Sequence, residues 1–101
     1  MALEALLRAS APGTPHRLQH FLYVPSERQA RKAAAHLRKE GFSTEQRLGA
    51  DGVNWLVLAT HRVVPSEAVV ESARSTMERI ASTFGGEYDG WEAEVTSAHL
   101  H

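Results

Sequence analysis

The sequence contains no cysteine, which excludes a disulfide scaffold, a cysteine zinc finger, an iron–sulfur cluster and a thiol nucleophile. Its longest apolar run, Trp55–Ala59, is far short of the roughly 20 residues that span a bilayer. No charge predominates either, since 11 basic and 12 acidic residues leave a net charge of −1, whereas a dedicated nucleic-acid binder is usually strongly basic. Residues 1–8 lack the apolar core of a signal peptide. We therefore expect a cytoplasmic protein with no membrane association.

A length of 101 residues is enough for one domain with its own apolar core. Near the start, Leu3, Leu6 and Leu7 have the spacing of one face of a short helix. The segment Ala11–Pro15 then interrupts any regular element, because it contains two prolines and a glycine. These features predict a flexible N-terminal tail over 1–15, a single domain over 16–96 and a C-terminal tail over 97–101.

Four segments have the composition of β-strands. The first alternates, with Leu18, Leu22 and Val24 on one face and Phe21 and Tyr23 on the other. The third contains the longest apolar run. Strands that are apolar on both faces are typical of the centre of a sheet, so these two strands should be central and the polar second strand should be an edge. The four predicted strands are Arg17–Val24, Phe42–Leu48, Val53–Thr60 and Glu87–Val95.

Two helices are predicted between these strands. Ser26, with Gln29 three residues later, has the spacing of a capping box, and Gly41 is suited to the left-handed cap that ends a helix. The first helix should therefore cover about 26–40, with an apolar stripe of alanines. The second should begin at Pro65-Ser66-Glu67, and Gly85-Gly86 should end it.

The predicted order is β-α-β-β-α-β. Its simplest closed form is the α+β, ferredoxin-like sandwich, in which both helices cover one face of a four-stranded antiparallel sheet. On that basis we expect Leu56 and Leu58 under the helices, and Phe21, Tyr23 and Trp55 on the uncovered face. Because a large exposed apolar patch is uncommon in a monomer, we expect a second copy of the chain, or Leu3, Leu6 and Leu7, to cover it.

No motif for catalysis or cofactor binding is found. The sequence lacks a nucleophile elbow, a phosphate-binding loop and a dinucleotide fingerprint, and its histidines form no H-x-x-x-H pair. We predict no cofactor and no metal site. His20 is expected to be a core histidine bonded to the backbone. An enzyme would need His20 or His61 in one pocket with the acidic residues of the last strand, which more simply discourage edge-to-edge pairing.

Charge is nevertheless distributed unevenly. The first predicted helix carries five basic and two acidic residues, and the last strand carries four acidic residues and no basic one. The basic helix, or the uncovered aromatic face, could bind RNA, and this is the alternative function. However, the basic–Gly–aromatic signature of an RNA-recognition motif is absent from the third strand. The basic residues are Arg28, Arg31, Lys32, Arg38 and Lys39.

The run Glu87-Tyr88-Asp89-Gly90-Trp91 is unusual for a strand. Asp89-Gly90 within a strand favours a bulge that would redirect the flanking aromatic side chains. The run resembles the E-Y-D-G-W signature of the RraB family, regulators of ribonuclease E activity. The resemblance extends over residues 17–95, through His20-Phe21-Leu22, Ala33–Phe42 and Met77–Phe84.

This resemblance implies a non-enzymatic regulator that binds ribonuclease E in its non-catalytic scaffold region and dampens RNA cleavage. The chain departs from the family's pattern, since it is near neutral with a basic first helix, whereas the members are markedly acidic with an acidic tail. The residues predicted to contact the partner are Phe21, Tyr23, Trp55, Glu87, Tyr88, Asp89, Gly90 and Trp91.

Overall fold

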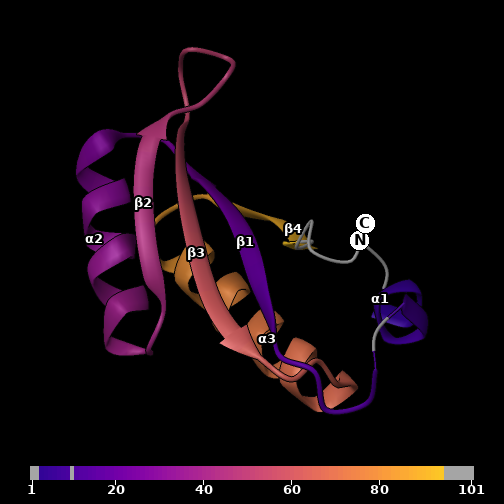
Figure 1. Cartoon of the computed structure of the whole chain (residues 1–101). Helices are drawn as coiled ribbons and strands as arrows, with labels where there is room; N and C mark the ends of the chain where they lie inside the picture. Colours follow the sequence, from indigo (N-terminus) through magenta and orange to yellow (C-terminus); the bar gives the residue numbers. More distant parts are fainter. Residues whose placement is uncertain (1–2, 10, 95–101) are drawn as a thin grey trace.

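The computed structural model describes residues 3–9 and 11–94, and the predicted end of the last strand at Val95 and the predicted C-terminal tail lie outside these residues. Three helices and four strands follow one another along the chain (Figure 1). They are α1 (Leu3–Ala9), β1 (His16–Val24), α2 (Glu27–Lys39), β2 (Ser43–Leu48), β3 (Trp55–Val63), α3 (Glu67–Thr83) and β4 (Glu87–Ala93). Within the described part of the chain, no helix has the length and apolar character needed to cross a membrane.

The strands form one antiparallel sheet in the order β2-β3-β1-β4. The α+β fold is therefore confirmed, and so is the prediction that the first and third strands are central. Helices α2 and α3 lie on the same side of this sheet (Figure 1). Strands β2 and β4 are the two edges, and the polar sequence of β2 suits an edge because half of its surroundings are solvent.

Local sequence signals determine where the helices begin and end. The hydroxyl of Ser26 accepts a hydrogen bond from the backbone N–H of Gln29 at 3.3 Å, and Ser66 accepts one from Val69 at 3.1 Å. Each serine thereby pairs an N–H that has no partner within the helix. At the other end of α2, Gly41 has a φ of +98°, a left-handed conformation that glycine adopts without steric cost.

The main core lies between the sheet and the two long helices. On α2, small alanines at helical spacing let the helix lie close to the strands. The same cluster takes in one face of the two central strands and the buried stripe of α3. Its buried residues are Leu22, Val24, Ala30, Ala33, Ala34, Leu37, Val57, Ala59, Met77, Ile80 and Ala81.

The predicted faces of the third strand are wrong. In the β1–β3 register, Phe21 lies opposite Leu58 and Tyr23 lies opposite Leu56, so the two leucines share the uncovered face with the aromatic residues. Trp55 packs instead against the core under the helices. A one-residue shift exchanges the faces of a whole strand, and a run that is apolar at every position carries no alternation to define them.

The N-terminal helix packs on the helix-covered side. Leu6 is 4% exposed and joins a second core cluster with Leu18, Val70 and Ala93. The prediction that this segment covers the uncovered sheet face is therefore wrong, and Leu7 remains exposed. The division into tails and a domain stays a prediction.

Gly86 allows the end of α3 to pass close to β1. A Cβ atom at this position would collide with the backbone carbonyl oxygen of Tyr23 and lie 2.8 Å from Val24 Cγ1. We expect Gly86→Ala to lower the free energy of unfolding by about 3 kcal/mol or more, since the obstacle is backbone. Gly52→Ala, at a φ of +73° in open space, should cost only about 1–2 kcal/mol. Chemical denaturation measures the loss of stability in both variants, and equal losses would contradict the close approach of Gly86 to the backbone of β1.

Candidate functional site

Strand β4 contains the bulge that Asp89-Gly90 predicted. His20 lies opposite Trp91 and Leu22 lies opposite Tyr88, so two steps along β1 correspond to three along β4. Gly90 takes up the irregularity with a φ of +99°. Because of the extra residue, Tyr88 and Trp91 both lie opposite residues of the helix-covered face, although they are three positions apart.

The bulge brings Tyr88 to a pair of histidines on the two neighbouring strands. The Tyr88 hydroxyl lies 2.8 Å from Nδ1 of His20, and Nε2 of His20 lies 3.0 Å from Nε2 of His61. The three side chains thus form a continuous hydrogen-bonded row across β4, β1 and β3. His20, in the middle, is completely buried. We call this row the His–Tyr relay.

Burial sets the charge state of the relay. It lowers the pKa of His20 to about 4, with a further contribution from the nearby charge of His61, and it also lowers the pKa of His61. Burial raises the pKa of Tyr88 to about 12, which Arg74 opposes and Glu78 reinforces. At neutral pH, therefore, both imidazoles are uncharged and the tyrosine keeps its proton.

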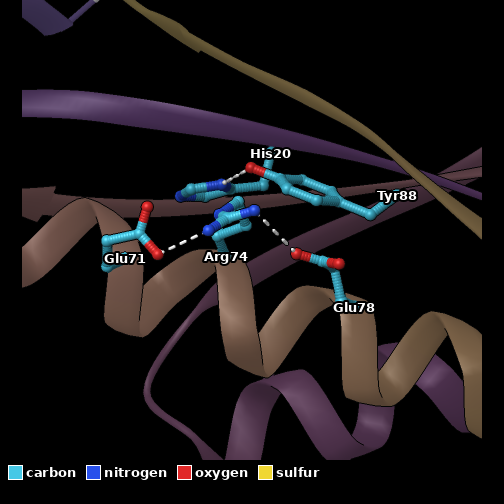
Figure 2. Close-up of polar contacts among 5 residues, drawn as sticks. All are labelled: His20, Glu71, Arg74, Glu78 and Tyr88. Carbon is cyan, nitrogen blue, oxygen red and sulfur yellow. Dashed lines mark hydrogen bonds and ion pairs between the residues drawn. The ribbon is translucent and has the colours of Figure 1, made fainter.

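Helix α3 places a positive charge next to Tyr88. Figure 2 shows the Arg74 guanidinium between Glu71 and Glu78, below the His20 and Tyr88 side chains. The guanidinium lies 2.6 Å from the Glu71 carboxylate and 3.4 Å from that of Glu78. The two carboxylates raise the pKa of Arg74, with the Glu71 hydrogen bond as the largest cause. The positive charge of Arg74 beside the relay is thus largely compensated by these two carboxylates.

One side of the relay borders a surface hollow. This hollow, of about 350 Å3, lies beside His61 between the end of α2 and the first half of α3. The Phe42 ring lies 4.6 Å from the His61 ring and meets His20 edge-on at 5.9 Å. The remaining lining residues are Glu40, Ala68, Val69, Ser72, Ala73 and Thr76. Of the two histidines, His61 is therefore the one that a solvent proton reaches first.

A second hollow, of about 470 Å3, lies on the uncovered face of the sheet, and we call it the open-face hollow. It combines half-buried aromatic rings of β1 with exposed carboxylates of the β4 bulge. Five of the eight residues predicted to contact a partner line it, and one of them, Trp91, also packs against the core cluster on the helix-covered side. Its lining residues are Phe21, Tyr23, Asp89, Gly90, Trp91 and Glu92.

The other predicted contact residues lie elsewhere. Glu87 is exposed opposite Tyr23, whereas Tyr88 faces the histidines and Trp55 faces the core. The sequence did not single out Glu92, which joins the open-face hollow. His20 was predicted to bond to the backbone, but it bonds to two side chains instead. The registers of three strands bring positions 20, 61 and 88 together, and no sequence motif indicates this.

The catalytic arrangement considered from the sequence does not form. His20 is buried under the helices, while Asp89 and Glu92 line the hollow on the opposite face. No group of three or more potential metal ligands occurs among residues 3–9 and 11–94.

The relay predicts a specific pH dependence of stability. Because the folded-state pKa values of both histidines lie below the unfolded value near 6.5, the unfolded chain takes up protons first as the pH falls. The stability that this burial contributes above pH 6.5 should decline toward pH 4, by about 1.4 kcal/mol per pH unit at most for each group. Chemical denaturation at stepped pH should show a shallower slope for His20→Gln and an unchanged slope for His36→Gln, an exposed histidine of α2.

Comparison with known proteins places the chain in a family. None of the curated proteins matches the sequence. A family model does match it: RraB, described as regulator of ribonuclease activity B, over residues 3–93. This match takes in every element from α1 to β4, including the bulge and the relay, and it shows that the chain belongs to the RraB family.

Proposed function

We propose that this protein is a non-enzymatic, cytoplasmic regulator that binds a ribonuclease of the E type and lowers its cleavage of RNA. Membership of a family of regulators of ribonuclease activity supports the regulatory role. The open-face hollow supports binding to a protein, since it offers aromatic surface next to exposed charge on a rigid sheet. Buried aromatic anchors with a polar rim are typical of protein interfaces.

The composition of the hollow indicates the chemistry of the partner segment. Phe21 and Tyr23 supply apolar surface on β1, while Asp89 and Glu92 supply negative charge from β4. Glu87, opposite Tyr23, adds a third carboxylate on the same edge. A segment of the ribonuclease with an apolar side chain flanked by arginine or lysine would match both properties.

The same charges disfavour other occupants of the open-face hollow. RNA would bring phosphates toward Asp89 and Glu92, which repel them. A second copy of the chain, docked by a two-fold axis, would place two identical acidic rims against each other. A basic protein segment is therefore the occupant that the hollow fits best.

Removing the rim charges tests this proposal. We expect Asp89→Asn combined with Glu92→Gln to weaken binding to the host ribonuclease by about tenfold, mainly by losing charge complementarity. Glu67→Gln, which neutralises an exposed carboxylate at the start of α3, is the matched control and should bind normally. Affinity is measured by calorimetry, and inhibition by cleavage of a labelled RNA.

Two outcomes would contradict the proposal. The ribonuclease would be excluded as the partner if immobilised wild-type protein never enriched a ribonuclease from host lysate and RNA cleavage stayed unchanged. Equal binding by the double variant and the wild type would show that the open-face hollow is not the binding site. Light scattering of the free protein would show self-association, if the uncovered face binds a second copy instead.

A second candidate function is RNA binding through the exposed face of α2. Among the described residues, Arg31 pairs with Glu27, whereas Arg28, Lys32 and Lys39 are exposed and form no recorded ion pair. Their positions along α2 place the three cations over about 16 Å, at 1.5 Å per residue. This surface lies on the helix layer, away from the open-face hollow.

Fluorescence titration with a labelled single-stranded RNA tests the α2 surface. If the cations contact phosphates, affinity should fall steeply between about 50 and 200 mM salt, and Arg28→Gln with Lys32→Gln should flatten that dependence. Arg62→Gln, which changes an exposed arginine of β3, is the control. Absence of binding at the lower salt concentration excludes this function.

A further inference from the structure

We propose that His61, His20 and Tyr88 form an acid-responsive switch, in which a first proton, taken up at His61, reverses the hydrogen bond between His20 and Tyr88, a second proton separates His20 from His61, and the resulting movement of His20 alters the β4 bulge that forms the open-face hollow. The regulation of partner binding rests on the proposed function, whereas the switch itself is a property of the free chain. The proposal stands on the row of hydrogen bonds, the hollow beside His61 and the position of Tyr88 within the bulge.

The uncharged relay has two possible directions of hydrogen bonding. In one, Tyr88 donates to Nδ1 of His20, and Nε2–H of His20 donates to His61. In the other, Nε2–H of His61 donates to His20, and Nδ1–H of His20 donates to the Tyr88 oxygen. A neutral imidazole carries one proton on either nitrogen, so both arrangements satisfy every contact in the row.

A first proton selects the second direction. It enters at His61, which is half-buried and lines the hollow, whereas His20 is completely buried. Protonated His61 carries hydrogen on both nitrogens, so its Nε2 must donate to His20. His20 then donates to Tyr88, and the tyrosine changes from donor to acceptor.

A second proton breaks the row. With both imidazoles protonated, two N–H groups would face each other across the 3.0 Å between the Nε2 atoms, and two positive charges would adjoin. Neither histidine would have a lone pair to offer, so the rings must separate. Burial is the main cause of the low pKa of His20, about 4, and the charge of His61 lowers it further, which is the electrostatic expression of this conflict.

The charged groups around the relay do not remove this conflict. On α3, Arg74 opposes a positive charge near Tyr88, and Glu71 and Glu78 compensate Arg74. At the end of α2, Glu40 lines the hollow beside His61 but is engaged with Arg79 of α3 at 3.3 Å. No carboxylate is recorded in hydrogen-bond contact with either histidine of the relay, so a second positive charge there has no direct counter-ion among the described residues.

The β4 bulge is where this change reaches the surface. Tyr88 immediately precedes Asp89 and Gly90, which line the open-face hollow on the other side of the sheet. The bulge interrupts the regular pairing with β1, so the Tyr88 hydrogen bond is one of the contacts that fix its conformation. When that bond reverses and His20 moves away from His61, the spacing of the aromatic and acidic residues around the hollow should change.

Nuclear magnetic resonance of the full chain tests the switch without any partner. We expect the His61 and His20 ring nitrogens to titrate below pH 6.5, with His20 last, and the backbone amides of Asp89 and Gly90 to shift with the same midpoints. In Tyr88→Phe the histidines should still titrate, but the two amides should no longer follow them. His61→Gln is a second variant that removes the point of entry, and His36→Gln is the control.

Two results would overturn the switch. One is a midpoint near 6.5 for both histidines, as for exposed groups; the other is the same amide shifts in the wild type, Tyr88→Phe and His61→Gln, which would assign them to nearby carboxylates. If a variant fails to fold, as judged by its amide spectrum, the wild-type titration alone still decides whether the amide and histidine midpoints coincide.

Partner binding is measured separately at pH 7 and pH 4.5. Wild-type affinity for the ribonuclease should fall by a larger factor than that of Tyr88→Phe, which keeps the same surface carboxylates. An equal fall in both proteins would show that the relay does not regulate the surface. No binding at either pH, with coincident midpoints in the spectra, would refute the proposed function and leave the switch intact.

Discussion

Both nitrogens of His20 have to be paired, because this side chain is completely buried between the sheet and the helices. A buried polar group without a partner costs about 1–3 kcal/mol, a large share of the stability of a small domain. The central position of β1 supplies a neighbour on each side: His61 from β3 and Tyr88 from β4. The β4 bulge is needed for this arrangement, because regular pairing from the Trp91 end would turn Tyr88 to the opposite face.

The bulge therefore separates two kinds of chemistry. On the helix-covered side, Tyr88 enters a neutral hydrogen-bonded row that excludes charge. On the uncovered side, Asp89 and Gly90 lie at the surface beside aromatic residues. One short run of sequence thus serves the interior and the proposed binding surface together, and a change in one has a direct covalent path to the other.

The sequence predicted the features that depend on neighbouring residues. Ser26, Gly41 and Asp89-Gly90 act through local backbone geometry, so the helix boundaries and the bulge could be located without knowledge of the fold. The central positions of β1 and β3 followed from apolar residues on both faces. The family resemblance, carried by the run from Glu87 to Trp91, is confirmed by the family match over residues 3–93.

Features that depend on register or on distant packing could not be predicted in this way. The faces of β3 were assigned wrongly, because Trp55 to Ala59 is apolar at each position and either register buries similar side chains. Leu6 has the same helical spacing whether it packs on Ala93 or on the opposite face, so only the tertiary structure decides. The relay requires the registers of three strands at once, and a histidine at position 61 gives no sign of its partner at position 20.

The near-neutral total charge conceals an arrangement that can orient a partner. The exposed cations of α2 lie on the helix layer, while the carboxylates of β4 border the hollow on the uncovered face of the sheet. Such a separation produces a directional field although the net charge is only −1. A basic protein segment is drawn to one layer and repelled by the other, so encounter favours the face where the bulge lies. At neutral pH the uncharged relay adds nothing to this field. Each proton that the relay gains places positive charge close to the acidic rim, and this charge weakens the attraction for a basic partner.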